Sequence, residues 1–184
     1  MVSGYCSRLA RTTLAGAEQS CLREVLIVVS ALSVQDPRER PAEKRQAADQ
    51  AHKRWDDPDS DFVAWLNLWA GFEAARDELS GNQLRRWCRE HYINYLRMRE
   101  WHDTYRQLRQ LLRDMELHIA AAEPEDDEAA LKARKLQQSR LHQALLTGLL
   151  SNIGQFIEKR EYLGARNRKF MIHPGSGLAK KTPK

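Results

Sequence analysis

The residues best suited to bind a charged partner lie in residues 80–113, where eight arginines are interleaved with tryptophans and tyrosines. A guanidinium can donate two parallel hydrogen bonds to a phosphate, and an aromatic ring can stack on a nucleobase. An isolated row of arginines is more often a solvated surface than a binding site. The interleaved aromatic residues favour phosphate binding here, and the candidate contacts are Arg85, Arg86, Arg89, Arg99, Arg106, Arg109 and Arg113.

A second group of candidate contacts lies near the end of the chain, where residues 129–184 carry 12 Lys/Arg and only 2 Asp/Glu. Positive charge gathered in this way favours a polyanionic partner. Within this region, residues 173–177 read His-Pro-Gly-Ser-Gly, which either offers backbone N–H groups to a phosphate or forms an ordinary turn. The candidates here are Arg166, Arg168, Lys169, Ser176, Lys180 and Lys181.

The sequence lacks the common catalytic and metal-binding motifs. No Gly-x-x-x-x-Gly-Lys-Ser/Thr loop could hold a nucleotide, no serine has a Gly-x-Ser-x-Gly context, and the six histidines lack metal-ligand spacing. Asp127 and Glu128 resemble a magnesium-binding acidic motif in letters alone, because they follow Pro124 and open a helix. We expect no catalytic residue, cofactor or metal in this chain, and a stand-alone hydrolase is the least favoured interpretation.

The composition is that of a globular protein with one core, or with one core and a small appendage. The 184 residues are 42% hydrophobic and 30% charged, with a mean hydropathy of -0.68. No apolar run approaches the ~20 residues of a membrane-spanning helix, and the first residues lack a signal-peptide pattern. Cys6, Cys21 and Cys88 are widely spaced, which indicates reduced structural thiols. We expect a cytoplasmic protein with no membrane partner.

The arginine row needs a long helix to carry it, and the sequence predicts one. Ser80 and Gln83 have capping-box spacing, which predicts a helix start. His102 shares the spacing of the arginine row and is expected on the basic side. After a break over residues 92–94, apolar residues recur on another side of the helix, at Met98, Trp101, Tyr105, Leu108, Leu112, Met115 and Ile119.

Helices are predicted through most of the remaining sequence. The capping residues Asp59 and Ser60 precede a row that we expect in the core, formed by Phe62, Trp65, Leu66, Trp69 and Phe72. The acidic residues 123–127 end the long helix and begin the next one. Further helices are predicted over residues 9–14, 21–32, 42–55 and 127–150, and short strands over 151–156 and 168–172.

Six stretches of the sequence occur in the order found in one protein family. They are residues 31–41 (ALSVQDPRERP), 60–69 (SDFVAWLNLW), 82–91 (NQLRRWCREH), 94–101 (NYLRMREW), 148–153 (GLLSNI) and 172–178 (IHPGSGL). The series closely resembles the C-terminal region of DEAH-box RNA helicases of the bacterial HrpA type. The resemblance covers nearly the whole chain, from about Arg8 to Lys184.

The resemblance implies a mainly α fold. In this family two RecA-like motor domains hydrolyse nucleoside triphosphate and are followed by a winged helix, a helical helicase-associated (ratchet-like) domain and an OB-fold domain. Residues 1–20 would then be the tail of the preceding winged-helix or linker segment, residues 21–150 the helical domain, and residues 151–184 the first strands of a truncated OB fold. The helical domain would help to form a channel for single-stranded RNA.

The resemblance also implies partners and a limit on activity. ATP and magnesium would bind the motor domains, which this sequence lacks, so we expect a fragment that is inactive alone. Its partners would be single-stranded or structured RNA and the motor domains of the same helicase. The whole protein would unwind RNA in the 3′-to-5′ direction or remodel ribonucleoproteins. The alternative is a helical docking module that binds protein and has no RNA affinity of its own.

Overall fold

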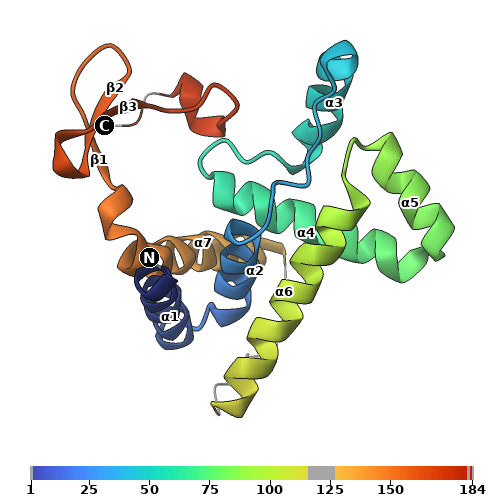
Figure 1. Ribbon diagram of the computed structural model, residues 1–184, viewed down its shortest axis with the longest axis horizontal. Coiled ribbons are helices and arrows are strands. Elements are labelled where there is room, and N and C mark those ends of the chain that lie inside the picture. The colour runs from blue at the N-terminus through green and yellow to red at the C-terminus, as the bar shows by residue number, and fades with distance from the viewer. Residues whose placement is uncertain (1, 116–126, 182, 184) are drawn as a thin grey trace. The chain divides into compact units, whose positions relative to one another are not determined.

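A computed structural model describes the backbone of residues 2–115, 127–181 and 183, and the side chains of residues 10–115, 133–179, 181 and 183. Helices dominate these residues (Figure 1). They are α1 (Val2–Glu18), α2 (Leu22–Leu32), α3 (Arg45–His52), α4 (Asp61–Glu78), α5 (Gly81–Glu90), α6 (Tyr95–Asp114) and α7 (Asp127–Leu149). The mainly α fold expected from the sequence is confirmed, and every predicted helix is present.

The remaining elements are short. Single turns of 3₁₀ helix precede and follow α3, at Ala42–Lys44 and Lys53–Trp55, and one more follows α7 at Leu150–Asn152. Three strands come next, namely β1 (Gly154–Phe156), β2 (Glu161–Gly164) and β3 (Lys169–Met171). Further 3₁₀ turns occupy Ala165–Asn167 and Gly177–Lys180. No helix in the described part of the chain is long and apolar enough to cross a membrane.

The chain forms two compact units. The central unit comprises Ile27–Leu112, and the terminal unit comprises Met1–Leu26 together with Arg113–Lys184. All five tryptophans of the sequence lie in the central unit. Tryptophan fluorescence therefore reports on the central unit alone.

Tryptophan side chains build the core of the central unit. Trp69 of α4 and Trp101 of α6 meet edge to face with ring centroids 5.1 Å apart, and neither is more than 2% exposed. The Trp101 indole N–H donates to the Ile27 carbonyl and to the Ser30 hydroxyl, each at 3.0 Å. A buried indole needs such a partner for its N–H group. This hydrogen bonding fixes α6 against α2.

The predicted helix starts are present in α4 and α5. Ser60 caps α4, because its hydroxyl accepts from the Val63 N–H at 3.3 Å. The Ser80 N–H donates to the Gln83 side-chain oxygen at 2.9 Å, which is the glutamine half of the predicted capping box. Both caps satisfy N–H groups that the first turn of a helix leaves without partners.

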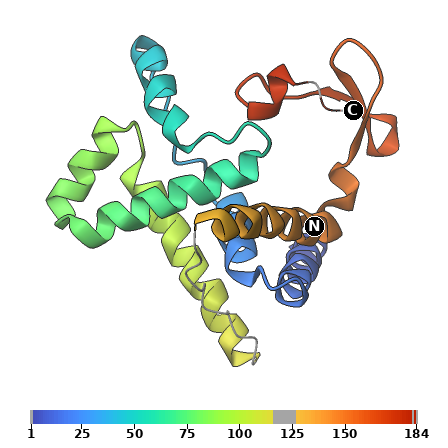
Figure 2. The same cartoon turned by 180° about the vertical axis from the view of Figure 1, so that it is seen from behind.

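The break predicted over residues 92–94 is a left-handed turn that ends α5. Tyr92 has φ 54°, and its N–H donates to the Arg89 carbonyl at 3.2 Å. The next N–H, of Ile93, donates to the Cys88 carbonyl at 2.8 Å. These two bonds form a Schellman motif with tyrosine in the position that glycine usually takes. The motif reverses the chain between α5 and α6, as Figure 2 shows from behind.

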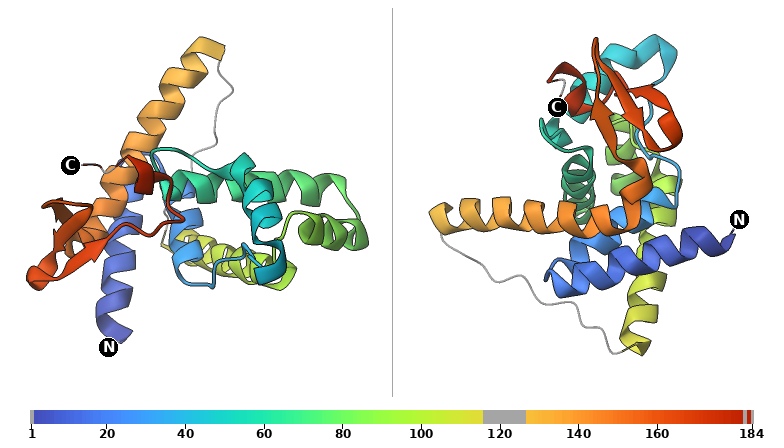
Figure 3. Two further views of the ribbon diagram at one scale, coloured as in Figure 1. Left: turned by 90° about the horizontal axis from the view of Figure 1, so that it is seen from above. Right: turned by 90° about the vertical axis from the view of Figure 1, so that its left-hand side faces the viewer.

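In the terminal unit, α1 packs along α7 (Figure 3). Leu141, Ala144 and Leu145 of α7 are buried. The Gln137 side-chain amide of α7 donates to the Ser20 carbonyl at 3.3 Å and to the Glu24 carboxylate at 3.1 Å. These contacts hold α7 at the turn between α1 and α2.

The three strands form one antiparallel sheet in the order β1-β2-β3. Two strands were predicted from the sequence, and β2, which lies between them in the sheet, was missed. Phe156, Tyr162 and Phe170 are cross-strand neighbours on one face. A Cβ atom added to Gly154 would lie 2.2 Å from the Phe170 ring, so this glycine makes room for that ring. Whether the sheet begins an OB fold remains a prediction.

Two expectations for α6 and its apolar side were wrong. His102 was expected on the basic side but is only 8% exposed, because its ring stacks on Trp69 at 4.3 Å and contacts Glu73 at 2.5 Å. Met115 was expected in the apolar stripe but is 63% exposed. The stripe is buried at Met98, Trp101, Tyr105 and Leu112 and half-buried at Leu108, whereas Ile119 lies outside the described residues.

The aromatic row of α4 is only partly buried. Trp69 and Phe72 are in the core as expected, but Phe62, Trp65 and Leu66 are half-buried. The buried residues of α4 also include Val63 and Ala64, so this helix is covered on more than one side and no single row defines its core face. The predicted helix boundary in residues 123–126 lies outside the described residues, and α7 begins at Asp127 as predicted.

The buried cysteines agree with the prediction of reduced structural thiols. Cys21 and Cys88 are free and buried. Burial raises the pKa of each thiol to about 11. Both thiols therefore stay protonated and unreactive near neutral pH. The Cys6 side chain lies outside the described residues.

Candidate nucleic-acid interface

The arginines of α5 lie outside its buried face. Leu84 and Cys88 face the core, whereas Arg85, Arg86 and Arg89 are exposed. A position on a helix turns by about 100° per residue, so Arg85 and Arg89 share one flank and Arg86 points further outward. The short helix thus presents two arginines together on one side.

A cation–π contact links this flank of α5 to α6. The Arg85 guanidinium carbon lies 5.3 Å from the centroid of the Tyr95 ring, and Tyr95 is the first residue of α6. Arg89 follows Arg85 by one turn of α5, and Arg99 follows Tyr95 by one turn of α6. We call these four residues, Arg85, Arg89, Tyr95 and Arg99, the α5–α6 basic surface.

The basic side of α6 continues beyond this surface. Arg99, Arg106 and Arg113 are exposed and are spaced seven residues apart, which is about two turns of helix. Arg109 is also exposed and lies beside this row. The expectation that these arginines share one side of a helix is confirmed, although His102 does not join them.

Two candidate arginines already have carboxylate partners on their own helix. Arg86 donates to Glu90 at 2.8 Å, and this hydrogen bond raises the pKa of the guanidinium. Arg106 forms an ion pair with Asp103. Exposed pairs of this kind are weak, but they still compete with a phosphate for the guanidinium. Among the described ion pairs, none includes Arg89 or Arg99.

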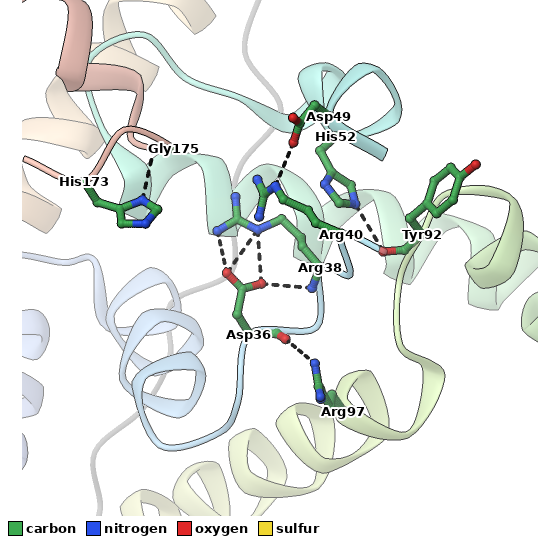
Figure 4. Close-up of polar contacts among 9 residues, drawn as sticks. All are labelled: Asp36, Arg38, Arg40, Asp49, His52, Tyr92, Arg97, His173 and Gly175. Carbon is green, nitrogen blue, oxygen red and sulfur yellow. Dashed lines mark hydrogen bonds and ion pairs between the residues drawn. The ribbon is translucent and has the colours of Figure 1, made fainter. Parts of the chain in front are cut away.

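The start of α6 is held by a junction that the sequence analysis missed. Residues 36–40 lie against residues 92–94, and Figure 4 shows Asp36, Arg38, Arg40 and Tyr92 from these segments together with Arg97. The Asn94 N–H donates to the Pro37 carbonyl at 2.8 Å, and Arg97 of α6 donates to the Asp36 carbonyl at 3.1 Å. We call these two segments the loop junction. Because Tyr95 and Arg99 lie within a few residues of it, the loop junction fixes their positions.

An ion pair holds the loop junction from within. Arg38 donates to both carboxylate oxygens of Asp36, with the shortest contact at 2.7 Å. Burial alone would raise the pKa of Asp36, but hydrogen bonds and the charge of Arg38 lower it below its usual range. The sequence showed only a proline-bounded loop here. The Asp36–Arg38 ion pair could have been suspected from the Asp-Pro-Arg order, but the hydrogen bond from Arg97 of α6 to the Asp36 carbonyl could not.

The second group of candidates lies in the terminal unit and is less organised. Arg166, Arg168, Lys169 and Lys181 are exposed, and Lys169 pairs with Glu161 at 3.0 Å. Ser176 is half-buried, and its hydroxyl accepts from the Leu178 N–H at 3.2 Å. The Lys180 side chain lies outside the described residues. The structure does not gather these side chains around a single feature.

Residues 173–177 form an ordinary turn. The Gly175 N–H donates to the His173 ring at 3.0 Å, and the Ser176 N–H donates to the His173 carbonyl at 2.9 Å. Both N–H groups are therefore already used. No glycine in the described part of the chain has the positive φ that an anion-binding nest needs. Of the two interpretations left open by the sequence, these contacts favour the turn.

Comparison with known proteins shows which proteins this chain is related to. Residues 7–65 match the family described as Helicase associated domain (HA2), ratchet-like. Over 178 residues the chain is 49% identical to the ATP-dependent RNA helicase HrpA of Escherichia coli and 48% identical to the ATP-dependent RNA helicase HrpA homolog of Haemophilus influenzae. Each alignment covers 96% of this chain and 13% of the relative. The chain is homologous to a segment of the HrpA-type RNA helicases.

The similarity extends beyond bacteria at a lower level. The pre-mRNA-splicing factor ATP-dependent RNA helicase prp22 of Schizosaccharomyces pombe is 33% identical over 105 residues, which cover 57% of this chain and 8% of prp22. The ratchet-like match includes helices of both units of the chain, from α1 into the start of α4. The α5–α6 basic surface lies outside that match but within the span shared with the HrpA-type relatives.

Proposed function

We propose that the chain is an RNA-binding accessory region of an HrpA-type RNA helicase, and that the α5–α6 basic surface binds the backbone of single-stranded RNA. The observation that carries this proposal is the contact of Arg85 with Tyr95 at 5.3 Å, because it joins two arginine-bearing helices at one aromatic ring. Exposed guanidiniums on both helices suit phosphates. The ring itself offers a face or edge to a base.

The same proposal extends to the longer protein. The chain spans 13% of its HrpA-type relatives, which are named as ATP-dependent RNA helicases. In such a protein the helical part, residues 21–150, would form part of the RNA channel, and residues 151–184 would begin an OB fold. Motor domains elsewhere would bind ATP and magnesium and drive 3′-to-5′ unwinding or ribonucleoprotein remodelling in the cytoplasm.

The test is a titration of labelled single-stranded RNA with the chain at several salt concentrations, followed by fluorescence anisotropy. The first variant carries Arg89→Gln and Arg99→Gln. The matched control carries Lys44→Gln and Arg45→Gln, which removes two exposed charges from the α3 region of the same unit. Each lost phosphate contact should reduce the slope of log K against log salt by about 0.7 for a single strand.

The proposal predicts that the Arg89/Arg99 variant loses about 1.4 in salt slope and binds RNA at least about tenfold more weakly, whereas the control keeps the native slope. Equal losses in both variants would show that only net charge matters. That result, or an absence of RNA binding by the folded native chain, would refute the α5–α6 basic surface as the site.

A docking module remains the second candidate, and one observation favours it. Several large apolar side chains at the end of α7 and on the sheet are exposed, among them Leu150 at 60% and Met171 at 69%. Where exposed apolar side chains form a contiguous surface, they often mark a protein contact. Concentration-dependent self-association in sedimentation, combined with no RNA binding, would favour this candidate over the first.

A further inference from the structure

A cluster of planar side chains joins the 3₁₀ turn Lys53–Trp55 to α5. The rings of Trp87 and His91 have centroids 4.5 Å apart, and Arg54 contacts the His91 ring nitrogen Nε2 at 2.6 Å. Trp55 is 5% exposed and packs beneath both, with its ring 6.0 Å from Trp87 and 5.9 Å from His91. We call Arg54, Trp87 and His91 the aromatic ledge.

The aromatic ledge is on a different side of α5 from the arginines discussed above. Trp87 and Arg89 are two residues apart, which places them about 160° apart around the helix. The ledge is also accessible, since Arg54 is exposed and both Trp87 and His91 are half-buried. It is therefore a separate surface feature and not an extension of the α5–α6 basic surface.

The contacts of His91 define which of its ring nitrogens donates and which accepts. Its Nδ1 lies 2.8 Å from the Trp87 carbonyl, which can only accept, so Nδ1 carries the proton. Its Nε2 then holds a lone pair and accepts from the Arg54 guanidinium. These two contacts hold the ring in one orientation.

The Arg54 guanidinium packs over an aromatic ring. Its guanidinium carbon lies 5.7 Å from the Trp55 ring centroid. In the described part of the chain it forms no ion pair. Its planar group is thus free of a competing acid, and an arginine plane can stack on a base as aromatic rings do.

We propose that the aromatic ledge is a stacking site for one nucleobase of single-stranded RNA, which rests on the proposed function of the chain. The base lies against the Arg54 and His91 planes, with the Trp87 ring beside them. The buried Trp55 supports the site from below. Base stacking of this kind tolerates any base and complements the phosphate contacts of arginines elsewhere on α5 and α6.

The experiment separates bases from phosphates. The native chain is titrated with a short oligoadenylate and with an oligomer of equal length whose bases are replaced by abasic residues. Arg54→Lys keeps the positive charge but loses the planar group, and Arg54→Ala loses both. Lys44→Ala, at an exposed cation away from the ledge, is the control. Arg54 is itself exposed, so neither variant removes a side chain from the core.

A stacking site predicts that the native chain binds oligoadenylate on the order of tenfold more tightly than the abasic oligomer. Arg54→Lys and Arg54→Ala should both reduce this ratio several-fold, whereas Lys44→Ala should preserve it. An unchanged ratio in both Arg54 variants would overturn the ledge but leave the proposed function intact, provided that the Arg89/Arg99 variant still loses binding. No RNA binding by the native chain would overturn both.

Discussion

At the scale of single residues, His52 is a buried group that should make stability depend on pH. It is 2% exposed, and its Nε2 donates to the Tyr92 carbonyl of the loop junction at 3.1 Å. Its Nδ1 is buried without a partner in the described part of the chain. Burial lowers the pKa of His52 below its usual value, although the contact with Tyr92 works in the opposite direction.

This pKa shift predicts that acid destabilises the central unit. The unfolded chain takes up a proton at about pH 6.5, whereas folded His52 stays neutral until a lower pH. Stability is therefore complete above about pH 6.5 and falls as the pH drops below it, by at most about 1.4 kcal/mol per pH unit. Denaturant unfolding followed by tryptophan fluorescence between about pH 5 and pH 8 measures this slope.

His52→Gln should flatten that slope, because glutamine can still donate to the Tyr92 carbonyl but does not titrate. His173→Gln is the control, since His173 is exposed and lies in the terminal unit, where tryptophan fluorescence does not report. A slope that survives His52→Gln would assign the acid sensitivity to another group.

At the scale of elements, the small sheet depends on how aromatic and glycine residues alternate. Phe170 of β3 lies over Gly154 of β1, where an added Cβ atom would be 2.2 Å from the Phe170 ring. A Cβ atom added at Gly164 of β2 would be 3.2 Å from the same ring. A side chain at position 154 would displace the Phe170 ring, whereas position 164 needs a shift of only a few tenths of an ångström. An aromatic ring covering glycines is a known way to stabilise such strands.

Gly154→Ala is therefore expected to loosen the sheet, and Gly164→Ala to do so less. Lys159 and Arg160 lie between β1 and β2 and are sites for trypsin. Limited proteolysis should cut there several-fold faster in Gly154→Ala than in the native chain, because local opening exposes the connection. Equal rates for the two alanine variants would contradict the proposed covering of Gly154 by Phe170.

The elements also show how far the sequence alone could go. Capping at Ser60 and Ser80 and the break at residues 92–94 were predictable, because those signals act within a few residues. The burial of His102 was not, since the covering ring comes from α4, 33 residues earlier at Trp69. The loop junction escaped prediction for the same reason, because contacts between distant segments leave no local pattern.

The candidate site was predictable in part. The exposure of Arg99, Arg106 and Arg109 followed from helical spacing. That Arg85 meets Tyr95, and that Arg86 and Arg106 have carboxylate partners, required the structure. The group of Arg54 with His91 was missed altogether, since the two residues are 37 positions apart.

At the scale of the whole molecule, the charge of the chain is divided between its candidate surfaces. Residues 81–113 carry 8 Lys/Arg and 3 Asp/Glu, and residues 129–184 carry 12 and 2. Net charge alone would favour the second region as the RNA-binding site. The geometry favours the first, because there an arginine of one helix contacts an aromatic ring at the start of a second arginine-bearing helix.

The most direct test of which region binds RNA is photo-crosslinking of the native chain to single-stranded RNA that contains 4-thiouridine. The crosslinked peptides are identified by mass spectrometry. We predict crosslinks concentrated in residues 81–113, with Tyr95 among the modified residues, and their loss in the Arg89/Arg99 variant. Crosslinks confined to residues 166–181, unchanged in that variant, would contradict the assignment of RNA binding to the α5–α6 basic surface.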